Sequence, residues 1–102
     1  MNIPEINANE LFRRLNLRTR EEDSFILLDV RNENESEICS IPGTDFLIPI
    51  KSLKNRISEI EKTVPKTKDI IVYCKSGIRS LAGAENLLED KFQKVYNLTG
   101  GL

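Results

Sequence analysis

The chain has 102 residues, of which 39% are apolar, and this is enough for one domain with a modest core. Fifteen Lys and Arg residues stand against sixteen Asp and Glu residues, so the net charge of −1 argues against binding of a nucleic-acid backbone. No apolar run is long enough to cross a bilayer, and the start lacks the basic and apolar regions of a signal peptide. We therefore expect a soluble, cytoplasmic protein that binds neither nucleic acid nor membrane.

The absence of histidine restricts the chemistry. Ser-His-Asp and Cys-His catalysis are excluded, and so is any zinc site that needs an imidazole. The two cysteines, Cys39 and Cys74, are too few for a zinc site built from cysteines alone. We expect free thiols rather than a disulfide, and we expect no metal and no cofactor. A nucleophile in this chain must therefore be activated by groups other than histidine.

In the first half of the chain, the expected elements alternate between strands and helices. Ile3–Ile6 is predicted as an edge strand, where its proline is tolerated. Asn7 is expected to cap a helix that packs on the sheet. The sheet-facing residues of that helix are expected to be Ala8, Leu11, Phe12 and Leu15. Phe25–Val30 is a nearly continuous apolar run, typical of a strand buried on both faces. Glu33–Ile38 is predicted as a single helical turn or a loop.

The second half continues the alternation. Phe46–Ile48, Ile70–Tyr73 and Val95–Leu98 are predicted as strands. Ser52 is expected to cap a helix that ends before Pro65, and another helix precedes the last strand. The apolar positions are Leu53, Ile57, Ile60 and Val64 in the first of these helices and Leu81, Ala84, Leu87 and Leu88 in the second. The pattern predicts an α/β domain with helices on both faces of the sheet.

The segment that follows the strand Ile70–Tyr73 carries the most chemistry. Open α/β sheets place their sites where a strand ends and a helix begins. At such a junction the free N–H groups and partial positive charge of the helix stabilise an anion, and the thiolate of Cys74 is an anion. Lys75 and Arg79 add positive charge, so we expect both to lower the pKa of Cys74. Gly77 permits a backbone conformation that turns successive N–H groups inward.

From the residues alone, Cys74 is equally well explained as a small buried apolar residue at the end of a strand. The resemblance of four segments to a known family changes that balance. The segments are Leu27–Arg31 with Asp-Val-Arg, Ile41–Gly43 followed by Ile48-Pro49, Cys74–Ser80 with Cys-x-x-Gly-x-Arg, and Leu98–Leu102 with Gly-Gly. In this order and spacing they resemble the rhodanese-like sulfurtransferase domain along nearly the whole chain.

The resemblance implies a rhodanese-like fold, which is an open, mainly parallel five-stranded sheet with helices on both faces. Residues 1–102 would form a single domain of this kind. Family members usually continue beyond the Gly-Gly element into a Trp-containing segment and a final helix, so the domain is expected to be truncated at its C-terminus. Whether it is excised from a larger protein stays open.

The resemblance also implies a reaction without a cofactor. Cys74 would take a sulfane sulfur from thiosulfate or from the persulfide of a cysteine desulfurase, carry it as a persulfide, and pass it to a nucleophilic acceptor. The residues expected to bind the sulfur through their backbone N–H groups are Lys75, Ser76, Gly77, Ile78 and Arg79. The side chain of Arg79 would either contact an anionic donor or pair with an acid that shapes the loop.

The residues expected to support the site are Asp29, Arg31 and Ser80. For Asp29 and Arg31, a structural ion pair is at least as good an interpretation as contact with the substrate. Asn32 and Ser36 stand where the family often has a glutamate and an aromatic residue, so the loop there is expected to be held less tightly. The acidic residues Glu33, Glu35 and Glu37 are interpreted as a solvated face.

The segments Glu37–Gly43 and Leu47–Pro49 are most similar to the C-terminal rhodanese domains of adenylyltransferase–sulfurtransferase fusion proteins in molybdopterin and thiamine biosynthesis. That resemblance implies an acceptor, namely the activated C-terminal glycine of a ubiquitin-like sulfur carrier protein. The adenylyltransferase domain would then be a second partner. Cys39 would either resolve a persulfide on Cys74 or be a plain thiol, and its position in the sequence favours the plain thiol.

Two other functions compete with sulfur transfer. Cysteine phosphatases and arsenate reductases also place a cysteine and an arginine between a strand and a helix, in the pattern Cys-x5-Arg. Here four residues separate Cys74 from Arg79, so the loop is short for a tetrahedral phosphate. The second alternative is a catalytically inactive binding or regulatory module. The presence of Cys74, Gly77 and Arg79 argues against a pure scaffold.

Overall fold

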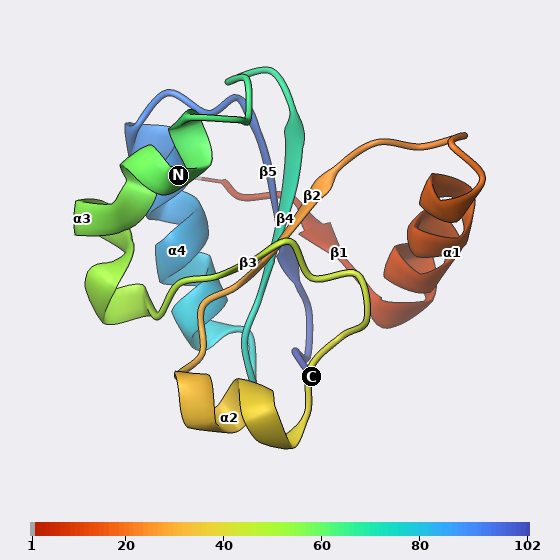
Figure 1. Ribbon diagram of the computed structural model, residues 1–102, viewed down its shortest axis with the longest axis horizontal. Helices are drawn as coiled ribbons and strands as arrows, with labels where there is room; N and C mark the ends of the chain where they lie inside the picture. The colour runs from red at the N-terminus through yellow and green to blue at the C-terminus, as the bar shows by residue number, and fades with distance from the viewer. Residues whose placement is uncertain (1) are drawn as a thin grey trace.

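A computed structural model describes residues 2–102. Within these residues, five parallel strands form one sheet in the order β1-β5-β4-β2-β3 (Figure 1). The strands are β1 (Glu5–Ile6), β2 (Ile26–Asp29), β3 (Phe46–Leu47), β4 (Asp69–Tyr73) and β5 (Lys94–Leu98). The predicted α/β class and five-stranded parallel sheet are confirmed.

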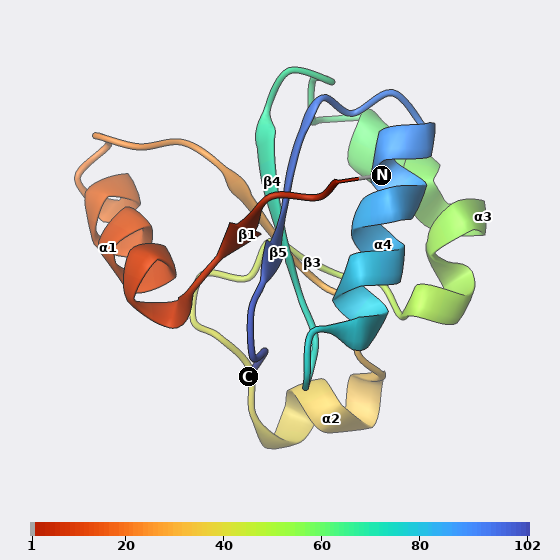
Figure 2. The same ribbon diagram turned by 180° about the vertical axis from the view of Figure 1, so that it is seen from behind.

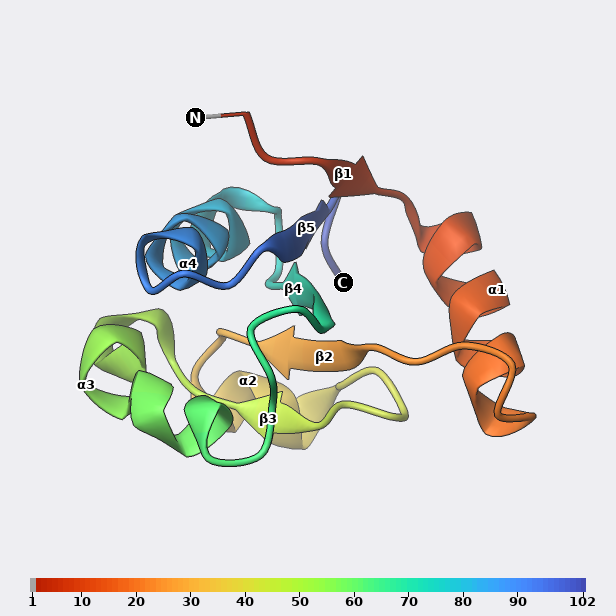
Figure 3. The same ribbon diagram turned by 90° about the horizontal axis from the view of Figure 1, so that it is seen from above.

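The helices cover both faces of the sheet, as expected. They are α1 (Ala8–Thr19), α2 (Glu33–Ile38), α3 (Ile50–Glu61) and α4 (Ile78–Glu89). Figure 3 shows α1 on one side of the sheet and α3 with α4 on the other. The short helix α2 lies across the end of the sheet where β2, β4 and β5 finish (Figure 1). The segment Glu33–Ile38, for which a helical turn and a loop were both open, is therefore a helix.

Each face of the sheet has its own hydrophobic core. Leu27 and Ile71 pack toward Leu11 of α1, whereas Leu28 and Val72 belong to the core that includes residues of α3 and α4. Successive residues of a strand point to opposite faces, so continuous apolar runs are what a sheet covered on both sides requires. The two cores hold β2 and β4 between them.

The first helix begins as the sequence predicts. Asn7 Oδ1 accepts a hydrogen bond from the N–H of Glu10 at 2.8 Å, and the N–H of Asn7 donates to Glu10 Oε1 at 3.3 Å. This reciprocal pair is a capping box. Strand β1, which precedes it, lies at one edge of the sheet and pairs with β5 (Figure 2). None of the helices within residues 2–102 has the length and apolar character needed to span a membrane.

The predicted cap at Ser52 is wrong. Helix α3 begins at Ile50 with Pro49 as its N-cap, so Ser52 lies in the first turn. The reason is that the chain is tied to β2 up to the start of the helix, since the N–H of Ile50 donates to the carbonyl of Val30 at 3.0 Å. The helix ends at Glu61, before the predicted boundary.

Three residues expected on the sheet-facing sides of their helices are exposed, namely Ala8, Phe12 and Leu81. Phe12 is 57% exposed and Leu81 is 42% exposed. Phe12 and Leu81 each follow a buried residue, Leu11 and Ser80, and one residue turns the helix surface by about 100°. The apolar face of each helix is therefore narrower than the sequence pattern predicts.

Candidate active site

The sheet places Cys74 at the end of its central strand. Strand β4 ends at Tyr73, and α4 begins at Ile78 with Gly77 as its N-cap. Gly77 has a φ of +96°, in the left-handed region that favours glycine. This conformation turns the chain from the strand into the helix within four residues, so Cys74 lies directly beneath the N-terminus of α4.

Hydrogen-bond donors surround the sulfur of Cys74. The N–H groups of Gly77 and Ser80 donate to Cys74 Sγ at 3.0 and 3.3 Å. The thiol in turn donates to Ser80 Oγ at 3.3 Å. Both Cys74 and Ser80 are fully buried. The arrangement combines free backbone N–H groups with the positive end of a helix dipole, and these groups stabilise negative charge on sulfur.

This environment lowers the pKa of Cys74 below the usual value of a thiol. Burial acts to raise the pKa, but hydrogen bonds from the side chain and backbone of Ser80 and from the backbone of Ser76 and Gly77 outweigh it. The causes differ from those expected, because neither Lys75 nor Arg79 is among the main contributors. The largest contributions that lower the pKa of Cys74 are thus the hydrogen bonds of Ser76, Gly77 and Ser80, not the formal charges of Lys75 and Arg79.

Arg79 is engaged elsewhere. Its two terminal nitrogens donate to the two carboxylate oxygens of Glu35 at 2.7 and 2.8 Å. This fork-to-fork ion pair holds the pKa of Glu35 at about 2. Glu35 also accepts from the N–H of Asn32 at 3.0 Å, which anchors the start of α2. Of the two roles weighed for Arg79, the geometry favours pairing with an acid that shapes the loop.

Asp29 and Arg31 form a second ion pair at the end of the neighbouring strand, β2. Arg31 donates to the carboxylate of Asp29 from its backbone N–H, Nε and Nη2 at 2.9, 3.0 and 2.9 Å. Its Nη2 also donates to the carbonyl of Cys39 at 2.6 Å. Asp29 is fully buried and Arg31 is 4% exposed. With all of these contacts made within the protein, the pair is best explained as structural.

A cavity of about 330 Å³ lies beside the Cys74 loop. The residues that line it are Arg31, Glu35, Ile38, Cys39, Lys75 and Leu102. Lys75 and Ser76 are exposed, and Ile78 is 76% exposed, so the side chains of these loop residues face outward. Cys39 is a free, exposed thiol on the wall of the same cavity. The fold therefore brings Cys39 and Lys75 together although 35 residues separate them in the sequence.

Sequence reasoning missed three contributors to this site. Glu35 was assigned to a solvated face, although the Asn32-x-x-Glu35 spacing of a capping box marked it as a helix-start residue. Asn97 donates from Nδ2 to the carbonyl of Gly77 at 3.2 Å and accepts from Ser80 Oγ at 2.5 Å. The sequence feature that could have identified Asn97 is its position as a polar residue within an apolar strand. The N–H of Leu102 donates to the carbonyl of Cys74 at 2.9 Å.

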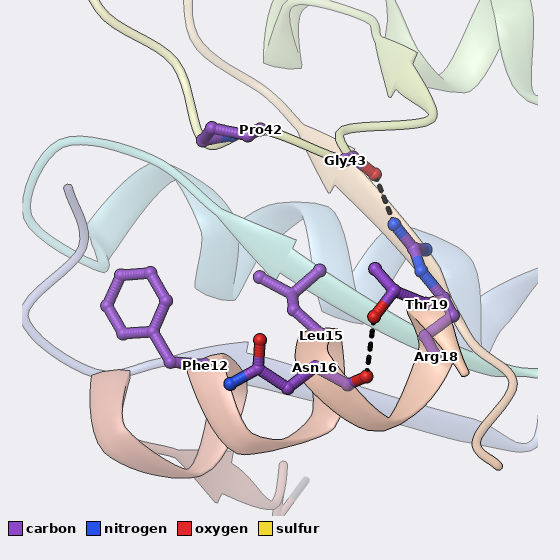
Figure 4. A pocket seen from close by; sticks show the side chains of 7 residues that line it. All are labelled: Phe12, Leu15, Asn16, Arg18, Thr19, Pro42 and Gly43. Carbon is purple, nitrogen blue, oxygen red and sulfur yellow. Dashed lines mark hydrogen bonds between the residues drawn. The ribbon is translucent and has the colours of Figure 1, made fainter. Parts of the chain in front are cut away.

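A separate cavity of about 400 Å³ lies between α1 and the turn at Pro42 and Gly43 (Figure 4). Arg18 closes one end, because Nη2 donates to the carbonyl of Gly43 at 2.6 Å and Nη1 donates to Asp45 at 2.9 Å. Its guanidinium charge is thus paired within the protein. None of the sequence-predicted site residues lines this cavity.

Known proteins resemble the chain over most of its length. It is 31% identical over 100 residues to a sulfurtransferase of Allochromatium vinosum, covering 98% of this chain and 85% of that protein. It is 33% identical over 77 residues to the thiosulfate sulfurtransferase GlpE of Coxiella burnetii, covering 76% of this chain and 67% of that protein. The first four curated relatives differ greatly in length, and the chain spans 26%, 85%, 56% and 49% of them.

Solved structures share the fold. A rhodanese-like domain protein from Staphylococcus aureus matches with a TM-score of 0.77 and 25% identity, covering 97% of this chain and 87% of that chain. The family model for the rhodanese-like domain matches residues 13–102. The solved structure thus shares the fold expected from the four sequence segments, and the family model matches the family that they resemble. The chain belongs to the family of rhodanese-like domains.

Proposed function

We propose that the chain is a sulfurtransferase that carries a sulfane sulfur as a persulfide on Cys74. The observation that carries the proposal is the position of the sulfur at the N-terminus of α4, where Gly77 and Ser80 donate to it and its pKa is lowered. A persulfide is also an anion, so the same donors stabilise the loaded form. The sulfurtransferases among the relatives support the same reaction.

The reaction consists of two displacements at sulfur. With thiosulfate as donor, the thiolate of Cys74 attacks the outer sulfur, a new S–S bond forms, and the bond to the sulfonate breaks so that sulfite leaves with the electron pair. A nucleophilic acceptor then attacks the terminal sulfur of the persulfide. That S–S bond breaks, and Cys74 leaves as the thiolate. With a nucleophilic acceptor such as cyanide, no external oxidant or reductant is needed.

The donor and acceptor approach through the cavity beside the loop. Cys74 is fully buried and does not itself line this cavity, but Lys75, the next residue in the loop, lines it together with Cys39. Lys75 supplies an exposed positive charge for an anionic donor. Arg79, which is held by Glu35, positions the loop, and the N–H groups of Gly77 and Ser80 hold the sulfur. Asp29 and Arg31 support the adjoining strand end.

The acceptor in this proposal is a ubiquitin-like sulfur carrier protein whose C-terminal glycine has been activated by an adenylyltransferase. Here the outer sulfur of the persulfide is the nucleophile: it attacks the glycine carbonyl, AMP leaves, and an acyl disulfide with Cys74 forms. Two thiol molecules then reduce the S–S bond, which releases the carrier thiocarboxylate and the Cys74 thiol and leaves a disulfide between the two thiols. This choice of acceptor rests on the segments Glu37–Gly43 and Leu47–Pro49, which contain the turn between α2 and β3. A cytoplasmic location belongs to the same proposal, and the free state of Cys39 and Cys74 is consistent with a reducing compartment. Transfer to a free thiol or cyanide but not to an adenylated carrier would contradict this choice of acceptor.

Steady-state transfer of sulfur from thiosulfate to cyanide tests the activity. Three proteins are compared, namely the native chain, Cys74→Ser and Cys39→Ser. We expect turnover in the native chain and in Cys39→Ser, and no turnover in Cys74→Ser. Loss in Cys39→Ser with retention in Cys74→Ser would move the nucleophile to Cys39. Hydrolysis of an aryl phosphate that depends on Cys74 would instead support the phosphatase alternative.

A further inference from the structure

A buried hydrogen-bond chain leads from the reactive sulfur to strand β5. Cys74 Sγ lies 3.3 Å from Ser80 Oγ, and Ser80 Oγ lies 2.5 Å from Asn97 Oδ1. Cys74 and Ser80 are fully buried and Asn97 is 4% exposed. Asn97 does not touch the sulfur in these contacts, so any influence that it has on Cys74 passes through Ser80 or through the loop.

The carbonyl of Gly77 fixes which way the amide of Asn97 faces. Asn97 Nδ2 donates to this carbonyl at 3.2 Å. In the reversed orientation, Asn97 Oδ1 would face the Gly77 carbonyl and two acceptors would oppose each other. Asn97 therefore presents Oδ1, which is an acceptor only, to the hydroxyl of Ser80.

The hydroxyl of Ser80 has one proton to donate. With Asn97 Oδ1 as its partner, the proton points toward Asn97, and Ser80 Oγ is left to accept a hydrogen bond from the thiol of Cys74. We infer that Asn97 is a positioning residue of the sulfur-transfer site, which sets the direction of the Ser80 hydroxyl and thereby holds the proton on Cys74 in the resting protein. This inference rests on the proposed function only in taking Cys74 as the residue that carries the sulfur.

Ionisation of Cys74 then involves a change of partner. When the thiol loses its proton to solvent, the Ser80 hydroxyl turns from Asn97 Oδ1 to Cys74 Sγ, where it donates to the thiolate. Asn97 Oδ1 loses its donor in that state, and an unpaired buried acceptor is unfavourable. The backbone N–H groups of Gly77 and Ser80 donate to the sulfur in either state. Asn97 thus opposes ionisation while the backbone favours it.

The charged and titratable groups near the loop come from several elements. They are Asp29 and Arg31 after β2, Glu35 in α2, Tyr73 in β4, Lys75 in the loop and Arg79 in α4. Two ion pairs, Asp29 with Arg31 and Glu35 with Arg79, account for four of them. The hydroxyl of Tyr73 lies 2.8 Å from Thr44 Oγ1. Substitution of Asn97 changes none of these groups directly.

The pH dependence of Cys74 alkylation tests the inference. The measurement uses iodoacetamide and intact-protein mass spectrometry in a Cys39→Ser background, because the exposed Cys39 would also react. Asn97→Leu removes the acceptor and frees the Ser80 hydroxyl for the thiolate. We expect the midpoint of the profile to fall by about one pH unit. An unchanged or higher midpoint would overturn the inference.

A second substitution distinguishes an effect of Asn97 through the Ser80 hydroxyl from an effect through the loop. Asn97→Leu also removes the hydrogen bond to Gly77, and a purely structural role would act through that bond. In a Ser80→Ala background, the inference predicts that Asn97→Leu no longer shifts the midpoint, because the intermediary is gone. A shift of the same size in both backgrounds would show that Asn97 acts by holding Gly77 and would overturn the inference.

A nearly isosteric variant covers the case in which Asn97→Leu does not fold. Asn97→Asp keeps the acceptor that faces Ser80 and makes it stronger, so we expect the alkylation midpoint to rise. Part of that rise must disappear in the Ser80→Ala background, and an equal rise in both would contradict the inference. Alkylation needs no sulfur donor, so failure of this test and failure of sulfur transfer are observed separately.

Discussion

Two neighbouring strands, β2 and β4, end in buried polar residues, and the two ends are built in different ways. After β2, Arg31 donates three hydrogen bonds to the carboxylate of Asp29 and a fourth to the carbonyl of Cys39. After β4, hydrogen bonds surround the sulfur of Cys74, and the nearby Arg31 and Arg79 form their ion pairs with Asp29 and Glu35 instead. At the end of β2, two opposite charges are paired. At the end of β4, hydrogen-bonding groups surround a sulfur that can be neutral or negatively charged.

A buried polar group can serve either stability or reactivity, depending on whether a counter-charge is fixed beside it. A buried charge is tolerated when its counter-charge is fixed beside it, and such a pair resists change. A buried thiol without a counter-ion can exist as thiol, thiolate or persulfide, because N–H groups can donate to sulfur in each form. The first strand end is therefore suited to holding the fold and the second to carrying a reacting group.

The largest expected effect belongs to Cys74→Ser. We predict that sulfur transfer falls below detection, since a serine hydroxyl cannot form a persulfide. The fold should survive because the change is nearly isosteric and the hydroxyl can use the N–H groups of Gly77 and Ser80. Activity assays measure the loss of sulfur transfer, and thermal unfolding checks that the fold is retained. Transfer at the native rate would place the nucleophile elsewhere.

At the other strand end, Asp29→Ala should act on stability. It leaves the guanidinium of Arg31 buried without a counter-charge, and we predict a loss of about 3–5 kcal/mol in the free energy of unfolding. Denaturant unfolding measures this loss, with Cys74→Ser as the comparison. If Asp29→Ala costs less than about 1 kcal/mol, the distinction between the two strand ends is wrong.

The two glycines near the C-terminus offer a matched pair. Gly100 and Gly101 both have positive φ values, +76° and +63°, so alanine strains the backbone at either position. A Cβ on Gly101 would collide with the carbonyl oxygens of Cys74 and Lys75, whereas one on Gly100 meets no atom within 4 Å. We predict that Gly101→Ala lowers transfer by about tenfold more than Gly100→Ala does. Equal effects would show that the close approach to the loop is unimportant.

The smallest effect concerns the ion pair of Glu35 and Arg79. The pKa of Glu35 is about 2 in the folded protein, below the usual value for a glutamate, so the pair stabilises the fold above pH 4.5. That contribution is lost as the pH falls toward 2. Glu35→Gln should lower Tm by at most about 5 °C near pH 6. The difference should vanish near pH 2, and a Tm difference that persists there would contradict the assigned role.

Much of the fold follows from local patterns in the sequence. The continuous apolar runs of β2 and β4 predicted a sheet covered on both faces, and Asn7 predicted the start of α1. The cap of α3 did not follow, because the start of that helix is set by a hydrogen bond from Ile50 to Val30 in another element. Local capping rules do not contain such a contact.

The candidate site was predictable where it is continuous in the sequence and unpredictable where it is not. The loop from Cys74 to Ser80 could be read as an anion-binding turn, since its donors belong to neighbouring residues. Glu35 and Asn97 lie far from it along the chain, and tertiary structure alone brings them to Arg79 and Ser80. The role of charge in activating Cys74 was overestimated for the same reason, because the partner of Arg79 was unknown.

Intact-protein mass spectrometry after incubation with thiosulfate shows whether Cys74 carries sulfur. We predict that the native chain gains the mass of one sulfur atom, that a thiol reductant removes it, and that Cys74→Ser gains nothing. A cysteine-desulfurase system serves as the second donor. A sulfur adduct that persists in Cys74→Ser, or a folded native chain that takes up no sulfur from either donor, would contradict the assignment of Cys74 as the sulfur carrier.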